Sequence, residues 1–197
     1  MLNYAWRDYG NRVGAWRCLE LFDELNLPAS HLINTTVFEY APQIVDALKA
    51  RGDWVAGALA AMAQPQGEAA DCLAQAHAMT DVTGFGLAGH LSGICEASGV
   101  TATLEIDAIP FMDGAVELAA GGTKSSLFKD NRSGAGPVFG ADGPRGDLLF
   151  DPQTAGGLLA AVDAAQAEAV LAALIAAGYP AKRIGFIAAG EPVVKVI

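Results

Sequence analysis

The stretch that decides the fold of this chain is Met79-Thr80-Asp81-Val82-Thr83-Gly84-Phe85-Gly86-Leu87-Ala88-Gly89-His90-Leu91. Three glycines within six positions lead directly into a helical pattern of apolar residues, and a carboxylate and two hydroxyls stand just before them. A tight turn that feeds a helix N-terminus presents free backbone N–H groups to an anion. Asp81 adds a carboxylate oxygen, the kind of ligand that hard cations prefer. The stretch therefore predicts a phosphate or metal–phosphate site.

Gly84, Gly86 and Gly89 also fit the G-x-G-x-x-G pattern of dinucleotide-binding proteins, and Glu105 lies 21 residues beyond Gly84, near the position of the ribose-binding acid. That pattern should follow a buried aliphatic strand. Residues 77–81 are not an aliphatic run, so we expect no strand there and no dinucleotide site.

Composition and charge narrow the class of protein. Hydrophobic residues make up 52% of the 197, charged residues 17%, and the net charge is −10. An acidic chain is a poor partner for nucleic acid or for an anionic membrane. The three cysteines are widely spaced with no C-x-x-C pair, which is typical of a reducing cytosol. No signal peptide or membrane-length apolar stretch is visible, so the sequence predicts a cytoplasmic protein.

A second motif lies far downstream, at Asp151-Pro152-Gln153-Thr154-Ala155-Gly156-Gly157-Leu158-Leu159. The two motifs in this order, with Ile109-Pro110 and residues 114–119 between them, closely resemble the C-terminal half of the selenide, water dikinases (selenophosphate synthetases). The resemblance covers roughly residues 54–197. It implies an α+β fold, a mixed or antiparallel sheet with packed helices, like the C-terminal domain of the aminoimidazole ribonucleotide synthetase/selenophosphate synthetase superfamily. Ala155 departs from the family, which usually has serine there.

The resemblance also implies a site. Asp81 would contribute to a cluster of Mg²⁺ ions that bridges the phosphates of ATP. The residues expected near the nucleotide phosphates are Thr80, Thr83, Gly84, Gly86, Asp151, Gln153, Thr154, Gly156 and Gly157. From the residues alone, the favoured interpretation of Asp81 is a helix N-cap or turn carboxylate, and that of the second motif is a plain β-turn.

Three further features have structural interpretations. Phe85 is expected in the core, and His90, one turn into a helix, is expected to be packed or at the surface. One cluster of basic and amide side chains is read as a solvated loop in preference to a phosphate-binding one; it comprises Lys124, Ser125, Ser126, Lys129, Asn131 and Arg132.

The resemblance leaves the activity open. The family makes selenophosphate from ATP, selenide and water, and uses a reactive cysteine or selenocysteine with a nearby lysine and an ATP-binding half. Cys18, Cys72 and Cys95 have no such surroundings, so no residue is assigned a catalytic role. We expect the chain alone to be inactive and to bind Mg²⁺ and ATP weakly. The alternatives are a non-catalytic module, which completes an active site with a separate ATP-binding domain or as a homodimer, and an inactive product of gene rearrangement.

Residues 1–53 differ in composition from the rest, holding two of the three tryptophans. A helix near residues 13–25, a strand over 29–34 and a helix over 37–50 that closes at Gly52 are expected. Residues 4–14, together with 27–30 and the end of the second helix, resemble a fragment of the polysaccharide deacetylase (NodB-like) family. His31 is the only histidine of the segment, so that family's metal site cannot form. We therefore expect two units, a deacetylase-like fragment at 1–53 and a selenophosphate synthetase-like domain at 54–197.

Within residues 54–197, apolar periodicity predicts the secondary structure. The expected helices cover 54–62, 67–78, 87–98, 113–120 and 164–177, and the expected strands cover 101–107, 147–150, 158–162, 184–188 and 193–197. Gly99 and Gly178 are the expected stops of two of these helices. Residues 122–147 have no clear period and are expected to form a long loop.

Overall fold

A four-stranded mixed sheet organises the C-terminal part of the molecule. The computed structural model describes the backbone of residues 42–197 and the side chains from residue 52 onward. The strands are β2 (Val100–Leu104), β3 (Val138–Phe139), β5 (Gly185–Ala189) and β6 (Val194–Val196), in the order β3-β6-β2-β5. β6 runs parallel to both β2 and β3, whereas β5 is antiparallel to β2.

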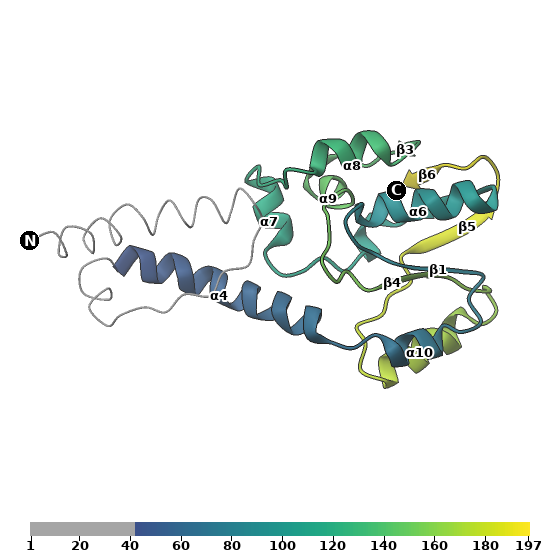
Figure 1. The fold of residues 1–197 in the computed structure, drawn as a ribbon, viewed down its shortest axis with the longest axis horizontal. Helices are drawn as coiled ribbons and strands as arrows, with labels where there is room; N and C mark the ends of the chain where they lie inside the picture. Colours follow the sequence, from purple (N-terminus) through teal and green to yellow (C-terminus); the bar gives the residue numbers. More distant parts are fainter. Residues whose placement is uncertain (1–41) are drawn as a thin grey trace, which may run out of the picture.

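Helix α6 (Gly86–Ser98) covers one face of this sheet (Figure 1). Ala88, Leu91 and Cys95 recur at helical spacing and are buried on it, facing Ala102 and Leu104 of β2. The helix ends where Gly99 takes a left-handed conformation, φ 61°. The alternation predicted for the strand thus places its Ala and Leu in the core.

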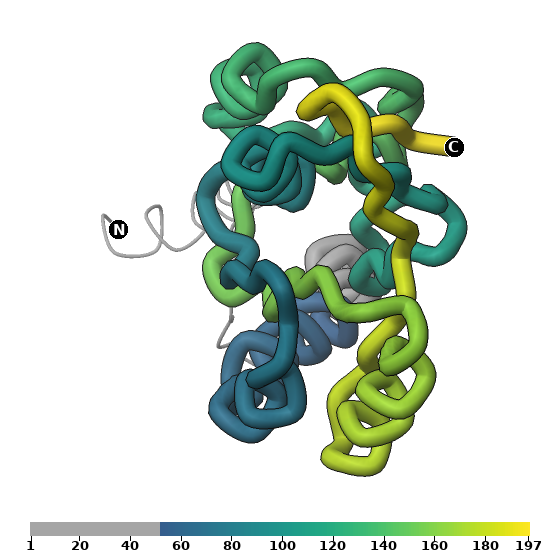
Figure 2. Tube along the Cα trace, turned by 90° about the vertical axis from the view of Figure 1, so that its right-hand side faces the viewer, coloured from purple at the N-terminus to yellow at the C-terminus, as the bar shows by residue number. Residues whose placement is uncertain are grey.

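A separate two-stranded sheet carries the first motif. β1 (Ala78–Asp81) pairs antiparallel with β4 (Leu158–Ala161), with Asp81 opposite Leu158. A second hydrophobic cluster lies against β4, where Ala69 of α5 (Gly67–Cys72) and Leu73 meet Leu174 of α10 (Ala167–Ala176). Figure 2 shows α5 and α10 in the lower half of the view and α6 in the upper half. The β1–β4 pair therefore lies between two separate cores.

The remaining helices connect these layers. They are α4 (Pro42–Ala63), the 3-10 turn η2 (Ile106–Ala108), α7 (Ala115–Ala120), α8 (Phe128–Gly134) and α9 (Gly143–Leu148). None of the described helices combines the length and the hydropathy that a transmembrane span requires.

Most elements predicted from periodicity are confirmed within a few residues. They are α6, α7, α10, β2, β4, β5 and β6. The α+β class with a mixed sheet is confirmed as well.

Five local predictions are wrong. Residues 78–81 do form a strand, because they pair with β4 although they are not aliphatic. The helix predicted over 67–78 ends at Cys72 as α5, and residues 73–77 lead from it to the strand. Residues 122–147 hold α8, β3 and most of α9 in place of a loop. Residues 147–150 end α9 and turn, and form no strand. Gly52 closes no helix, since α4 continues through it to Ala63.

Three predictions on the N-terminal part are not tested. The helix near 13–25 and the strand over 29–34 lie outside the described residues. The division into units at residue 53 stays a prediction, and α4 crosses that position.

Candidate functional site

The two sequence motifs meet at the open end of the β1–β4 pair. The backbone N–H of Val82 donates to the carbonyl of Gly157 at 2.9 Å, and that of Gly156 donates to the carbonyl of Val82 at 3.1 Å. The backbone N–H of Gln153 donates to the carbonyl of Thr83 at 3.1 Å. Residues 81–86 and 151–157 thus form one polar loop pair, held together by main-chain hydrogen bonds. We call it the motif loop pair.

Gly86 makes the close approach on which this arrangement depends. Its φ is +71°, and a Cβ at this position would lie 2.7 Å from the carbonyl oxygen of Leu149. The next contact holds the same two segments together, because the backbone N–H of Ala88 donates to that carbonyl at 2.9 Å. Gly84, by contrast, has nothing within 4 Å of the place of a Cβ. Gly84 and Gly86 are the two glycines of the first motif that were predicted near the phosphates, and of these only Gly86 is sterically required.

His90 holds the first turn from the helix side. Its Nε2 accepts the backbone N–H of Thr83 at 3.0 Å and lies 3.2 Å from the Thr83 hydroxyl. The Nε2 lone pair is used in this way and is not free for a metal. His90 is half-buried and bonded to the first turn, which agrees with the first of the two positions expected for it, packed or at the surface. Phe85 is not in the core as expected: its side chain is 67% exposed and its ring lies edge-on to His90, with centroids 5.8 Å apart.

Asn131 clamps the motif loop pair from α8. Its side-chain amide donates to the carbonyl of Gly84 at 2.8 Å and to that of Phe150 at 2.9 Å. Asn131 is buried, so its assignment to a solvated loop is wrong. The helix α8 is too short and too polar to show an apolar period, and for that reason sequence reasoning missed it.

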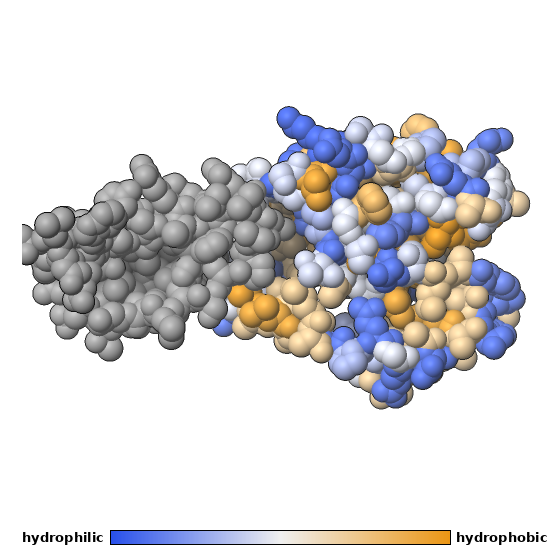
Figure 3. Space-filling view, in the orientation of Figure 1, coloured by the Kyte–Doolittle hydropathy of each residue, from blue (hydrophilic) through white to orange (hydrophobic). Residues whose placement is uncertain are grey.

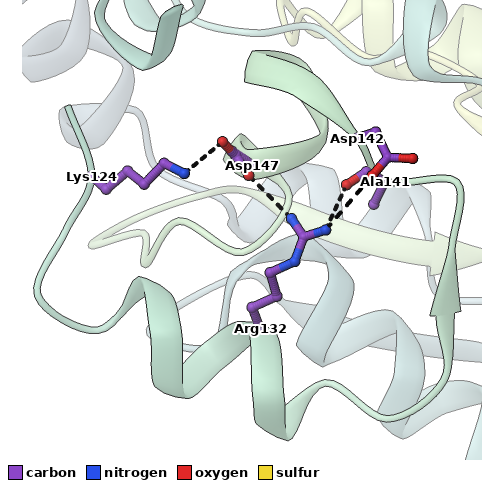
Figure 4. A network of polar contacts seen from close by, with 5 residues as sticks. All are labelled: Lys124, Arg132, Ala141, Asp142 and Asp147. Atoms are coloured by element: carbon purple, nitrogen blue, oxygen red, sulfur yellow. Dashed lines mark hydrogen bonds and ion pairs between the residues drawn. The ribbon is translucent and has the colours of Figure 1, made fainter. Parts of the chain in front are cut away.

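An ionic network fixes the surroundings of α8. The carboxylate of Asp147 on α9 forms ion pairs with the ammonium of Lys124 at 2.8 Å and with the guanidinium of Arg132 at 3.1 Å (Figure 4). Arg132 also donates a hydrogen bond to the carbonyl of Ala141 at 3.0 Å. The guanidinium of Arg132 also lies over the ring of Phe150, 4.9 Å from its centroid. Both cations are engaged by Asp147, so Arg132 joins α8 to α9, Lys124 joins the segment before α8 to α9, and neither is turned toward a phosphate.

The two carboxylates of the motifs differ in environment. Asp151 is buried, and this burial raises its pKa to about 6. Asp81, at the end of β1, is exposed. In the part of the chain with described side chains, no three His, Cys, Asp or Glu residues come close enough together to hold a metal ion. A cation at Asp81 would therefore need further ligands from outside the described side chains or from a bound phosphate.

The other predicted residues lie around the motif loop pair. Thr83, Gln153, Gly156 and Gly157 take part in its main-chain hydrogen bonds. The Thr80 hydroxyl donates to the carbonyl of Asp81 at 3.0 Å, and Thr154 is exposed. A cavity of about 580 Å³ lies elsewhere, among Trp54, Phe111 and Glu117, and none of the predicted site residues lines it.

The fold and the motif loop pair define an α+β domain with a polar loop site beside a mixed sheet. The chain belongs to the family described as AIR synthase related protein, C-terminal domain, whose model matches residues 45–197.

Curated relatives match over a shorter part of the chain. The selenide, water dikinase of Aeromonas salmonicida is 48% identical over 87 residues, which is 44% of this chain and 25% of that protein. The selenide, water dikinase of Cronobacter sakazakii is 48% identical over 94 residues, 47% of this chain and 26% of that protein. The chain thus spans about a quarter of the length of the curated relatives it matches. Among solved structures, a thiamine-monophosphate kinase from Stenotrophomonas maltophilia is 27% identical, with a TM-score of 0.38 over 62% of this chain and 32% of that one.

Replacing the clamp tests its contribution to the motif loop pair. We expect Asn131→Ala to lower the free energy of unfolding by about 2–3 kcal/mol, because two carbonyls lose their donor and one of these hydrogen bonds is buried. Urea denaturation measures this loss. Lys129→Ala, at an exposed position of the same helix, should stay within about 0.5 kcal/mol of the wild type. Equal losses in both variants would contradict the clamp.

Proposed function

We propose that this chain supplies the C-terminal wall of a selenide, water dikinase-type active site, with the motif loop pair facing the phosphates of ATP. Family membership and the identity of nearly half over 87 residues support this assignment. The observation that carries it is the meeting of the two motifs. The two motifs lie about 70 residues apart in the sequence, and both resemble the same family. In the structure they form one hydrogen-bonded surface.

Asp81 fits the part of a magnesium ligand. Asp81 is exposed, and its carboxylate forms no hydrogen bond or ion pair with any of the described residues. The Thr80 hydroxyl bonds only the backbone carbonyl of Asp81. Mg²⁺ is commonly bound through one or two protein carboxylates together with substrate phosphates. One available carboxylate at the edge of a rigid turn matches this donor set.

When bound, Mg²⁺ would neutralise charge on the phosphates during phosphoryl transfer. The chain's own contribution is positional. Gly86 lets the first turn lie against residues 149–151, and Asn131 and His90 hold it there, so Asp81 projects from a fixed backbone. The remaining ligands and the reactive groups belong to an ATP-binding domain, supplied in the same polypeptide, by a partner or by a second copy. On this proposal the residues described contribute binding and orientation, and the chain by itself has no dikinase activity.

Ligand-dependent stability tests the proposal. We expect Mg²⁺ with ATP to raise the melting temperature of the chain, since a ligand at about one hundred times its Kd adds about 2.7 kcal/mol of stability. In Asp81→Ala the shift should disappear, while ATP without Mg²⁺ should give little or no shift in either protein. Differential scanning calorimetry gives both values.

Asp71→Ala is the matched control, because Asp71 is also an exposed aspartate and lies on α5, outside the motif loop pair. It should keep the full shift. The Mg²⁺ and ATP concentrations are raised to about 10 mM, so that even weak binding would be detected. If the melting temperature of the wild type does not shift under these conditions, the motifs have a structural role only.

A further inference from the structure

Strand β5 leaves one edge of the four-stranded sheet open. It is the last strand in the order β3-β6-β2-β5 and pairs only with β2 among the described strands. Phe186 is 56% exposed and Ile187 is 41% exposed. Figure 3 shows apolar surface in the region where β5 lies in Figure 1. The opposite edge, β3, has only two residues.

The outer edge of β5 has a defined hydrogen-bonding pattern. Ala102 of β2 lies opposite Ile187, and the N–H of Ala102 donates to Val193, on the β6 side of β2. The pair Ala102–Ile187 is therefore a non-hydrogen-bonded pair of the antiparallel ladder, and the N–H and C=O of Ile187 point away from β2. By the two-residue period of a strand, the same holds for Gly185 and Ala189. Three residues thus present backbone groups at this edge that pair with none of the described residues.

Within the described part of the chain, this open edge lacks the usual protection. Natural edge strands carry lysine, proline or a bulge, or are covered by another element. Residues 185–189 read Gly-Phe-Ile-Ala-Ala, without a charge or a proline. Charged side chains stand only at the two ends, with Arg183 before the strand and Glu191 after it, and neither forms an ion pair with a described residue.

We propose that β5 pairs antiparallel with β5 of a second copy of this chain across a two-fold axis at Ile187. In this register Ile187 faces itself as a hydrogen-bonded pair, and Gly185 faces Ala189 of the partner copy, so the outward groups of all three residues are satisfied. Arg183 of each copy then lies at the end of the strand where the other copy has Glu191. An isologous interface repeats every contact, which gives two such charge pairs. The two four-stranded sheets become one continuous sheet of eight strands.

Charge complementarity favours an antiparallel second copy over a parallel one. A two-fold pairing brings opposite charges together at both ends, whereas a parallel copy of β5 would place Arg183 beside Arg183 and Glu191 beside Glu191. Like charges across a ladder destabilise it. The surface is distinct from the motif loop pair and does not depend on Asp81.

Sedimentation velocity of the full chain over a range of concentrations tests the pairing. The wild type should dimerise reversibly. Ile187→Pro should abolish the dimer and leave the monomer folded, because the N–H that proline removes faces outward. Arg183→Glu and Glu191→Arg should each weaken the dimer about tenfold, since attraction at both ends becomes repulsion. The double variant with both changes should restore dimerisation, which a general loss of stability would not do.

Hydrogen exchange gives an independent readout. The amides of Gly185, Ile187 and Ala189 should gain protection as the concentration rises, while those of Phe186 and Ala188, which face β2, should be protected throughout. The proposal is overturned if the chain stays monomeric at millimolar concentration, if it forms open-ended oligomers, or if a dimer persists unchanged in Ile187→Pro.

Discussion

Gly86→Ala is expected to lower the free energy of unfolding by about 4 kcal/mol. The backbone of Gly86 has φ +71°, where an L-residue is strained by about 1–2 kcal/mol. A Cβ would also lie 2.7 Å from the carbonyl oxygen of Leu149 and 2.9 Å from the carbonyl carbon of Phe150. Both are backbone atoms that cannot rotate away, so the two segments must separate, at a further cost of about 1–3 kcal/mol. Equilibrium urea denaturation measures the sum.

Gly84→Ala is the matched control within the same motif. Gly84 has no positive φ, and nothing lies within 4 Å of the position of its Cβ. We expect a change below about 1 kcal/mol, since alanine mainly restricts the unfolded chain. If Gly86→Ala leaves too little folded protein to titrate, the fraction folded at 10 °C by circular dichroism replaces the titration. A similar stability for the two variants would contradict the close approach at Gly86.

Asp151→Asn is expected to stabilise the chain at neutral pH and not at acid pH. Burial raises the pKa of Asp151 to about 6 from the usual 3.8, so the folded state holds this proton more tightly than the unfolded state. Stability therefore falls as the pH rises through this interval. The full effect is about 3 kcal/mol above pH 6–7 and vanishes below about pH 4. Asparagine has no charge to bury and escapes this loss.

Urea denaturation of both proteins from pH 4 to pH 8, without divalent metal, checks this expectation. The difference in unfolding free energy between Asp151→Asn and the wild type should grow steadily with pH. Asp130→Asn serves as control, because Asp130 is exposed on α8, and its difference from the wild type should stay flat. Parallel pH profiles for Asp151→Asn and the wild type would show that burial of this carboxylate carries no cost.

Local sequence signals were sufficient for much of the fold. Helix α6 follows from the spacing of its apolar residues and from the left-handed stop at Gly99. β2 follows from strict alternation, with Ala102 and Leu104 inward. These elements bury one face, and burial imposes a period that a sequence displays.

Elements defined by distant partners could not be predicted in this way. β1 is a four-residue polar strand that exists because β4 pairs with it, and nothing within residues 78–81 encodes that partner. α8 and α9 are held by the ion pairs of Asp147 with Lys124 and Arg132, which come from separate segments. Tertiary contacts override weak local propensity in both cases.

The same distinction applies to the site. Motif resemblance placed the residues of both turns near the nucleotide phosphates, but it did not give the main-chain contacts that join the turns, because those depend on the β1–β4 register. It missed the role of Asn131 for the same reason, since a buried amide that bonds two distant carbonyls leaves no period. Phe85 was misjudged because its neighbours in sequence are buried on α6 while its own position precedes that helix.

The hydrogen bond from Val82 to Gly157 closes a loop of about 75 residues. Closing a loop of this length costs about 4 kcal/mol of chain entropy, a cost that short-range helices do not bear. In a chain emerging from the ribosome, residues 81–86 must wait until residues 151–157 have been synthesised before either turn has its native neighbours. The segment with the phosphate-binding pattern thus matures late, and a nascent chain cut short before residue 157 carries the first motif without the surface that gives it shape.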